Sequence, residues 1–264
     1  MSGHSEDNKL GATDIPNEVL GPERTLLQMF KFYVEPEIER RRSGRLLTEP
    51  FILARAQVLF FEGRSPEVRL NDEVKIALLV RAPRAVQKGE AVSLSEIEHI
   101  EGSELDLADS DAGHFTAVLL NNNWLMFFDF RRNKRKASAL VKRAEEFCAM
   151  AEHALSERFA GPWVDNLYSA CELLAKARLI TSSAESSDVK SHGRIHSEIN
   201  RWGLLGNVDR KFVETLNKLS NLPTSARYKG DDISQHVSPE MVATARAEIS
   251  ELKIRLKRFS PDEV

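Results

Sequence analysis

The sequence predicts a two-part α+β protein, in which an antiparallel β domain is followed by a helical bundle. Between about residues 51 and 130 apolar and polar residues alternate with a period of two, which is typical of half-buried strands. From Asn133 onward apolar residues recur every three or four positions, as in packed helices. The 264 residues suffice for two domains, and we expect a polar tail at 1–22, the β domain at 23–132 and the bundle at 133–264.

Composition is that of a globular protein without a membrane anchor. Apolar residues make up 42% and charged residues 29%, and the net charge of -3 argues against a surface built throughout for nucleic acid. No apolar run reaches about 18 residues, and the first residues lack the features of a signal peptide. Cys148 and Cys171 lie in helical patterns as small core residues of a reducing compartment. We therefore expect a cytoplasmic protein that does not contact a membrane.

The strands are expected in the N-terminal half. Residues 25–34 are apolar and aromatic and favour a strand over a short helix, and the arginine-rich segment 35–45 predicts a loop or a frayed helical turn. Residues 74–80 alternate as a strand. A hairpin is expected for 114–120 and 123–130, because the asparagines between them tolerate left-handed backbone angles. We expect the sheet to curl into a sandwich or barrel.

An acidic run lies between the predicted strands and is expected to form a solvated loop. Its spacing does not match a calcium-binding loop, so no cation site is expected there. The run consists of Glu96, Glu98, Glu101, Glu104, Asp106, Asp109 and Asp111.

Helical periodicity predicts the elements of the bundle. A first helix covers residues 140–155, and Gly161-Pro162 ends it and begins the second, because proline suits a first helical turn. The second helix is apolar on more than one side, which places it at the centre of the bundle or in a subunit interface. Shorter helices are expected around 195–205 and before Leu222. The last helix is expected to start at Ser238-Pro239-Glu240.

Four features of the bundle, taken together, resemble the HEPN domain. They are a long helical hairpin, the segment Asn166–Ala177 with its Glu-x-x-x-Lys-Ala ending, the Ser191-His192 pair, and Ala226-Arg227-Tyr228 before the last helix, at the end of the stretch Leu216–Tyr228, which closes a helix and then becomes polar. The resemblance covers about residues 138–259. It implies a bundle that pairs as a two-fold homodimer, with any groove formed where two such stretches meet.

The residues that cut RNA in active HEPN domains are replaced here. Those members carry an Arg followed after four to six residues by a His, and these positions fall on Pro223 and Tyr228. Proline has no donor for a phosphate, and tyrosine, with a pKa of about 10, is not a base at neutral pH. The resemblance therefore implies a non-catalytic binding or assembly protein in phage defence or a toxin-antitoxin system of prokaryotes, with the β domain binding a protein partner.

A metal-independent endoribonuclease is the alternative. Its candidate residues are Arg227, Tyr228 and His236, although Arg227 and His236 are separated by eight residues. The competing structural interpretation pairs Arg227 with Glu172 and leaves Tyr228 as a cap of the core.

Cofactors and metals are not expected. His192 and His196 share a helical face, but Gly193 weakens that helix and no His-Glu-x-x-His arrangement is present. A glycine-rich phosphate loop is also missing from the sequence.

Basic clusters leave RNA contact open as a function. One contains Arg40, Arg41, Arg42 and Arg45, and the other contains Arg131, Arg132, Lys134, Arg135 and Lys136. The second cluster predicts salt-dependent contact with phosphates, and the competing interpretation is a solvated linker. Aromatic residues are not interleaved with it, which favours contact with the RNA backbone rather than with bases.

Overall fold

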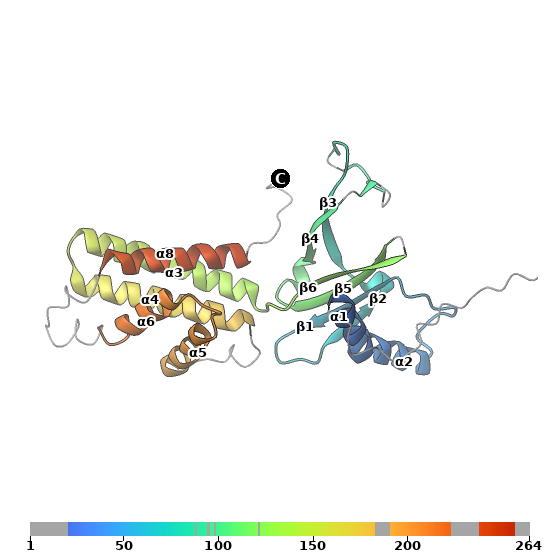
Figure 1. Ribbon diagram of the computed structural model, residues 1–264, viewed down its shortest axis with the longest axis horizontal. Helices are drawn as coiled ribbons and strands as arrows, with labels where there is room; N and C mark the ends of the chain where they lie inside the picture. Colours follow the sequence, from blue (N-terminus) through green and yellow to red (C-terminus); the bar gives the residue numbers. More distant parts are fainter. Residues whose placement is uncertain are drawn as a thin grey trace, which may run out of the picture. The chain divides into compact units, whose positions relative to one another are not determined.

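The computed structural model describes residues 21–87, 89–93, 96–97, 99–120, 122–182, 191–222 and 238–256. The chain divides into two compact units, residues 1–53 and 54–264 (Figure 1). The domain boundaries expected from the sequence stay predictions. In the described part of the chain, every helix is too short or too polar to cross a bilayer.

Residues 22–43 of the first unit are helical, so the strand expected for residues 25–34 is wrong. Helix α1 (Pro22–Met29) continues through a π-helical turn η1 (Phe30–Val34) into helix α2 (Glu35–Ser43). Proline at the first helical position and an acid beside it favour the start of α1.

Ion pairs one turn apart stabilise α2. The Glu37 carboxylate accepts from Arg40 at 2.7 Å and from Arg41 at 2.6 Å, and these i,i+3 and i,i+4 pairs fit only a helix. The hydrogen bond from Arg40 is the main reason why the pKa of Glu37 falls from 4.5 to about 2. The arginine-rich segment expected as a loop or frayed turn is thus a helix up to Ser43.

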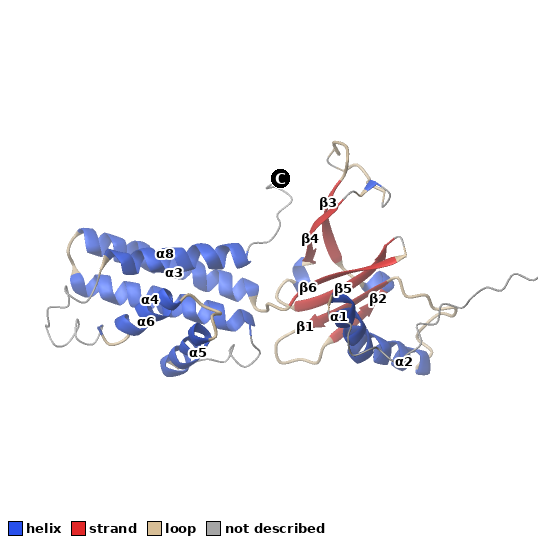
Figure 2. Ribbon diagram, viewed as in Figure 1, coloured by secondary structure: helices blue, strands red, loops and turns tan. Residues whose placement is uncertain are grey.

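A four-stranded antiparallel sheet begins the second unit (Figure 2). It consists of β1 (Arg55–Phe60), β2 (Glu67–Leu70), β5 (Gly113–Leu120) and β6 (Asn123–Asp129), in the order β2-β1-β5-β6. The β5–β6 hairpin confirms the prediction, and Asn122 has the left-handed φ of 63° that such a turn requires. Val58 and Phe115 are paired across β1 and β5 and are fully buried.

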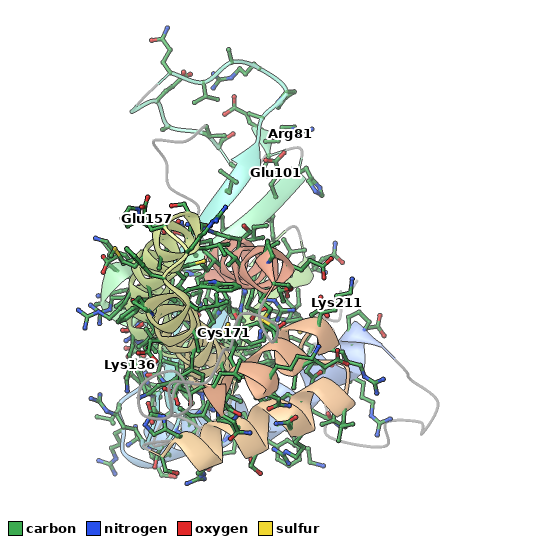
Figure 3. The ribbon with its side chains drawn as sticks, turned by 90° about the vertical axis from the view of Figure 1, so that its left-hand side faces the viewer. Arg81, Glu101, Lys136, Glu157, Cys171 and Lys211 are labelled. Carbon is green, nitrogen blue, oxygen red and sulfur yellow. The ribbon has the colours of Figure 1, made fainter. Side chains whose placement is uncertain are left out.

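A second, two-stranded sheet contains Glu101 and Glu104 of the acidic run. Strands β3 (Ile76–Arg81) and β4 (His99–Leu105) pair antiparallel, and Arg81 forms an ion pair with Glu101 across them (Figure 3). The solvated loop expected for residues 96–111 is therefore wrong over β4 and over the 3-10 turn η4 (Leu107–Asp109). The reason is neutralisation by arginines distant in sequence: Asp109, which is buried, pairs with Arg69 at 2.5 Å.

Five described helices form the C-terminal bundle: α3 (Lys134–Ser156), α4 (Ala160–Ser182), α5 (His192–Leu204), α6 (Arg210–Leu219) and α8 (Pro239–Leu256). Their bounds confirm the helices predicted from apolar periodicity, and Pro162 lies in the first turn of α4. Helix α4 contacts the other four, and only its Pro162 and Ser182 are exposed. The sequence predicted that this helix lies either at the centre of the bundle or in a subunit interface. In the structure α4 lies at the centre of the bundle.

Candidate functional site

Basic residues gather where β6 leads into α3, and we call Arg131, Arg132, Lys134, Arg135 and Lys136 the basic junction. Asp129, at the end of β6, accepts from the Arg131 Nε at 2.8 Å and from the Lys134 ammonium at 2.7 Å. Asp111 pairs with the Arg135 guanidinium at 2.6 Å. Two carboxylates thus neutralise part of the basic junction.

Helix α3 starts from a left-handed residue, Asn133, whose φ is 52° and whose side chain does not cap the helix. That side chain donates instead to Glu62 at 2.8 Å and to the Ile180 carbonyl at 3.1 Å. The Asp111 carboxylate accepts the backbone N–H of Arg135 at 2.8 Å and so replaces the missing cap. The start of α3 is therefore fixed by contacts with residues distant in sequence.

A cavity of about 190 Å³ lies beside the basic junction. It is lined by Arg131, Lys134 and Arg255, by the carboxylates Glu104 and Asp129, and by Ser103, Leu105, Ser110, His114 and Phe128. Arg131 also donates to the backbone carbonyl of Arg255. This cavity combines cations, carboxylates and hydrogen-bond donors.

The protonation states of two groups in the cavity are set by their surroundings. Burial, helped by the charge of Lys134, lowers the pKa of His114 from 6.5 to about 4, so this imidazole is neutral at pH 7. Burial alone would raise the pKa of Asp129, but hydrogen bonds from Arg131 and Lys134 outweigh it and lower that pKa from 3.8 to about 2. At pH 7 the cavity therefore holds the neutral imidazole of His114 beside the ionised carboxylate of Asp129, which is paired with Arg131 and Lys134.

A second polar cluster lies inside the helical bundle, on α4, α5 and α6. The Tyr168 hydroxyl is 3.4 Å from His196 Nε2, and the two rings stack with centroids 6.2 Å apart. Asn200 and Asn217 exchange amide hydrogen bonds of 3.1 and 2.7 Å. Polar side chains of these three helices are therefore within hydrogen-bonding distance of one another.

The predicted histidine pair falls in this cluster but is divided between two partners. His192 contacts the Glu172 carboxylate, whereas His196 faces Tyr168 and lies 3.5 Å from the Asn217 oxygen. Burial, with the nearby charge of Glu172, raises the pKa of Tyr168. Among the described residues, three or more metal-binding side chains do not come together at any point.

The catalytic candidates Arg227, Tyr228 and His236 lie outside the described residues, as does Pro223. The proposed pairing of Arg227 with Glu172 therefore stays a prediction. Both cysteines are buried and unpaired, and burial raises the pKa of each thiol. They lie in the bundle core, as their helical patterns predicted, and Figure 3 labels Cys171 among the helices.

The helices define the C-terminal half as a helical-bundle domain with a central helix and a polar cluster beside it. The family model described as HEPN domain matches residues 137–255, which agrees with the resemblance seen in the sequence. The C-terminal half of this chain is thus a HEPN domain, and the match does not extend into the N-terminal half. A comparison with curated proteins gave no match.

Sequence reasoning missed the cavity and most of the bundle cluster. One weak indication of the cavity was present in the sequence, because His114 is a polar residue that opens a mostly apolar strand. The sequence contained no indication that Asn200 and Asn217 would meet, because only packing of α5 against α6 brings them together.

Proposed function

We propose that this protein is a non-catalytic binding and assembly protein whose HEPN domain pairs as a homodimer and whose basic junction contacts RNA. We further propose that it acts in prokaryotic phage defence or a toxin-antitoxin system, with the β region binding a protein partner. The residues Pro223 and Tyr228, at the positions of the family's cutting pair, support the lack of catalysis.

The observation that carries the RNA contact is the first turn of α3. It contains Lys134, Arg135 and Lys136 in succession and has no acidic residue. The positive end of the helix dipole disfavours cations there by roughly 0.3–1 kcal/mol each at exposed positions. Lys134 and Arg135 are paired with Asp129 and Asp111, so the charge of Lys136 is the one in this turn that supports a role in binding a polyanion.

Two members of the basic junction are the best candidates for phosphate contacts. Asp129 and Asp111 engage Arg131, Lys134 and Arg135, whereas no ion pair between described residues involves Arg132 or Lys136. Lys136 is exposed on α3 (Figure 3). We therefore assign most of the affinity for RNA to Arg132 and Lys136.

Fluorescence anisotropy of a labelled single-stranded RNA at increasing KCl tests this contact. The variant Arg132→Ala/Lys136→Ala should bind more weakly, and its salt slope should fall by about 0.7 for each phosphate that the protein no longer neutralises. Arg210→Ala/Lys211→Ala, which removes two exposed charges from α6, is the matched control and should bind like wild type. Equal affinity of the junction variant and wild type would rule out the basic junction as the RNA-binding surface.

Light scattering of the full chain tests the homodimer. A dimer should persist at micromolar protein and at high salt, because helix packing buries apolar surface. A monomer under these conditions would contradict the assembly role.

A metal-independent endoribonuclease remains the second candidate, and the bundle cluster is the observation that favours it. His192 with Glu172, and His196 with Tyr168, are side chains of the kind used for general acid–base catalysis. A gel assay in the presence of a metal chelator would compare wild type with Arg227→Ala, His236→Ala and His196→Ala. Cleavage that disappears in any of these variants would favour the enzyme over the binding protein.

A further inference from the structure

We infer that the cavity beside the basic junction binds one phosphate monoester, the terminal phosphate of an RNA strand. This inference rests on the proposed RNA contact and adds to it the part of the RNA that enters the protein. A free nucleotide carries the same phosphate group, and the two sources can be separated by experiment. Three observations support the site: a face shared by several side chains, a buried hydrogen-bond donor and an excess of positive charge.

Side chains from several strands lie on one side of the cavity. His114 of β5 and Asp129 of β6 are cross-strand partners, so both leave the same face of the four-stranded sheet. Leu59 of β1, which pairs with His114 on the other side, packs against Leu105 of β4, so the end of β4 lies over this face. Ser103, two residues before Leu105, points the same way.

The residues between these positions point away, because successive side chains of a strand alternate between its faces. Phe128 precedes Asp129, and its ring lies on the opposite face of the sheet from His114. Glu104 likewise leaves β4 on the opposite face from Ser103. Of the two carboxylates at the cavity, Asp129 is therefore the one that shares the face of His114.

The buried donor of the cavity is the imidazole of His114, which is 3% exposed. The Lys75 backbone orients the Gln57 amide, so its NH₂ donates to the Thr116 hydroxyl at 3.1 Å. In the described part of the chain, the hydrogen of that hydroxyl has one acceptor, Nδ1 of His114 at 3.0 Å. This hydrogen-bond network assigns the imidazole hydrogen to Nε2, which no described residue engages. A phosphate oxygen would supply the acceptor.

Positive charge exceeds negative charge on this side of the cavity. Arg131, Lys134 and Arg255 line it against the one carboxylate Asp129, which leaves a surplus of two positive charges. Glu251 offsets part of this surplus through its pair with Arg255. A phosphate monoester carries about −1.5 to −2 charges at pH 7, whereas a phosphodiester within a strand carries one. The surplus therefore suits the end of a strand.

Two of these cations keep hydrogens for a ligand. Arg131 donates from Nε and Nη2 to Asp129 and from Nη1 to the Arg255 carbonyl, so three of its five N–H groups are used among the described residues. Lys134 donates to Asp129 at 2.7 Å and has two further N–H groups. Asp129 thus holds both cations in place, and the remaining hydrogens can go to phosphate oxygens.

The walls of the cavity favour a terminal group over a phosphate within a strand. They come from β4, β5, β6, the start of α3 and the end of α8, around a volume of about 190 Å³. A phosphate held from several sides can continue into a strand in one direction, whereas an internal phosphate continues in two. Arg132 and Lys136, which are close in sequence to Arg131 and Lys134, can hold the backbone that leads out.

Fluorescence anisotropy of a short, internally labelled oligouridylate tests the site in the full chain. The RNA is made with a 5′-phosphate, with a 3′-phosphate and with hydroxyls at both ends. Wild type should bind one of the phosphorylated forms about tenfold more tightly than the hydroxyl form, as expected for a hydrogen bond to a charged group.

Variants of the cavity should lose this preference. His114→Asn keeps an acceptor in place of Nδ1 but has no group at the position of Nε2, so the preference should disappear, whereas His114→Gln places an amide near Nε2 and should retain part of it. Lys134→Met should also reduce the preference. Lys142→Met, which removes an exposed charge from the same helix, is the matched control and should keep it.

Each preference compares two RNAs on the same protein, so it does not depend on the fraction of a variant that folds. If His114→Asn and Lys134→Met both keep the preference of wild type, the phosphate is held elsewhere and the inference is wrong.

The outcomes separate this inference from the proposed function. Equal affinity of wild type for all three RNAs would overturn the phosphate site, while the salt-dependent RNA contact stands. Calorimetry with uridine monophosphate tests the other source. Binding as tight as that of the phosphorylated RNA would keep the cavity as a phosphate site and overturn the RNA end as its ligand. If wild type binds uridine monophosphate but no RNA, the proposed RNA contact fails alone, and if it binds neither, both fail.

Discussion

Arg178 of α4 and Glu248 of α8 form an ion pair inside the bundle, with the arginine Nε 2.5 Å from the carboxylate. Their side chains are 3% and 2% exposed. The same guanidinium lies 3.2 Å from Glu251 and 3.4 Å from the carbonyl of Asn207, the residue that follows α5 and its C-terminal turn. One arginine thus ties two segments of the HEPN domain, α8 and the turn after α5, to its central helix.

We predict that Arg178→Met lowers the free energy of unfolding by roughly 3–5 kcal/mol, because it leaves the Glu248 charge buried without a partner. Arg178→Met/Glu248→Leu should recover much of this loss. Urea unfolding measures both. Arg246→Ala, which breaks the half-exposed pair with Glu152, is the control and should cost less than about 1 kcal/mol. If the double variant is as unstable as Arg178→Met, the loss of stability does not come from the unpaired charge of Glu248.

Acid should destabilise the fold through His114. Its pKa is about 4 in the folded protein and 6.5 as a free side chain, so the unfolded chain takes up the proton first as the pH falls. Stability from this group is complete above pH 6.5 and is lost between pH 6.5 and 4, by about 2 kcal/mol on going from pH 7 to pH 5. Unfolding of wild type and His114→Gln at the two pH values measures the difference, and the variant should lack this part of the slope.

His153→Gln is the matched control for that pH dependence, because His153 is exposed on α3. It should keep the full slope. An identical slope in wild type and His114→Gln would mean that another group controls acid stability.

A pair of glycine substitutions should act in opposite directions. Alanine at Gly113 would place its Cβ 3.0 Å from the Phe130 carbonyl oxygen and should destabilise the sheet by roughly 1–3 kcal/mol. Alanine at Gly193 in α5 meets open space and should stabilise the bundle by up to about 1 kcal/mol. Thermal unfolding measures both, and a neutral Gly113→Ala would refute the close approach of Phe130.

Both cysteines should resist thiol reagents in the folded protein. Cys148 and Cys171 are buried with raised pKa values, and only the thiolate reacts. Ellman's reagent should therefore titrate two thiols in urea and almost none in buffer. Rapid reaction of either thiol in buffer would show that α3 and α4 separate readily.

The sequence was most informative where one period dominates. The helices of the bundle and the β5–β6 hairpin were predictable, because their apolar positions follow a single spacing and the asparagine turn has a known conformation. The strand prediction for residues 25–34 was wrong. Aromatic residues favour strands, whereas the oppositely charged residues one turn apart in 37–41 favour a helix. Local propensity was outweighed there by the helical segment around it.

The polar sites were the least predictable part. Asp109 meets Arg69, and Asn200 meets Asn217, only after the chain has folded, and neither pair has a fixed spacing in sequence. An acidic run therefore gave the impression of a loop although its members pair with arginines elsewhere. The candidate RNA residues were found from charge alone, whereas the burial of His114 became visible only in the structure.

Because α4 is surrounded by the other helices of the bundle, it is a poor place to attach a label. A larger side chain on that helix would push against several neighbours simultaneously, since it touches α3, α5, α6 and α8. Met150 on α3 and Leu204 on α5 are 54% and 76% exposed. Fluorophores, cross-linkers or spin labels attached at these two outward positions should leave the interior undisturbed.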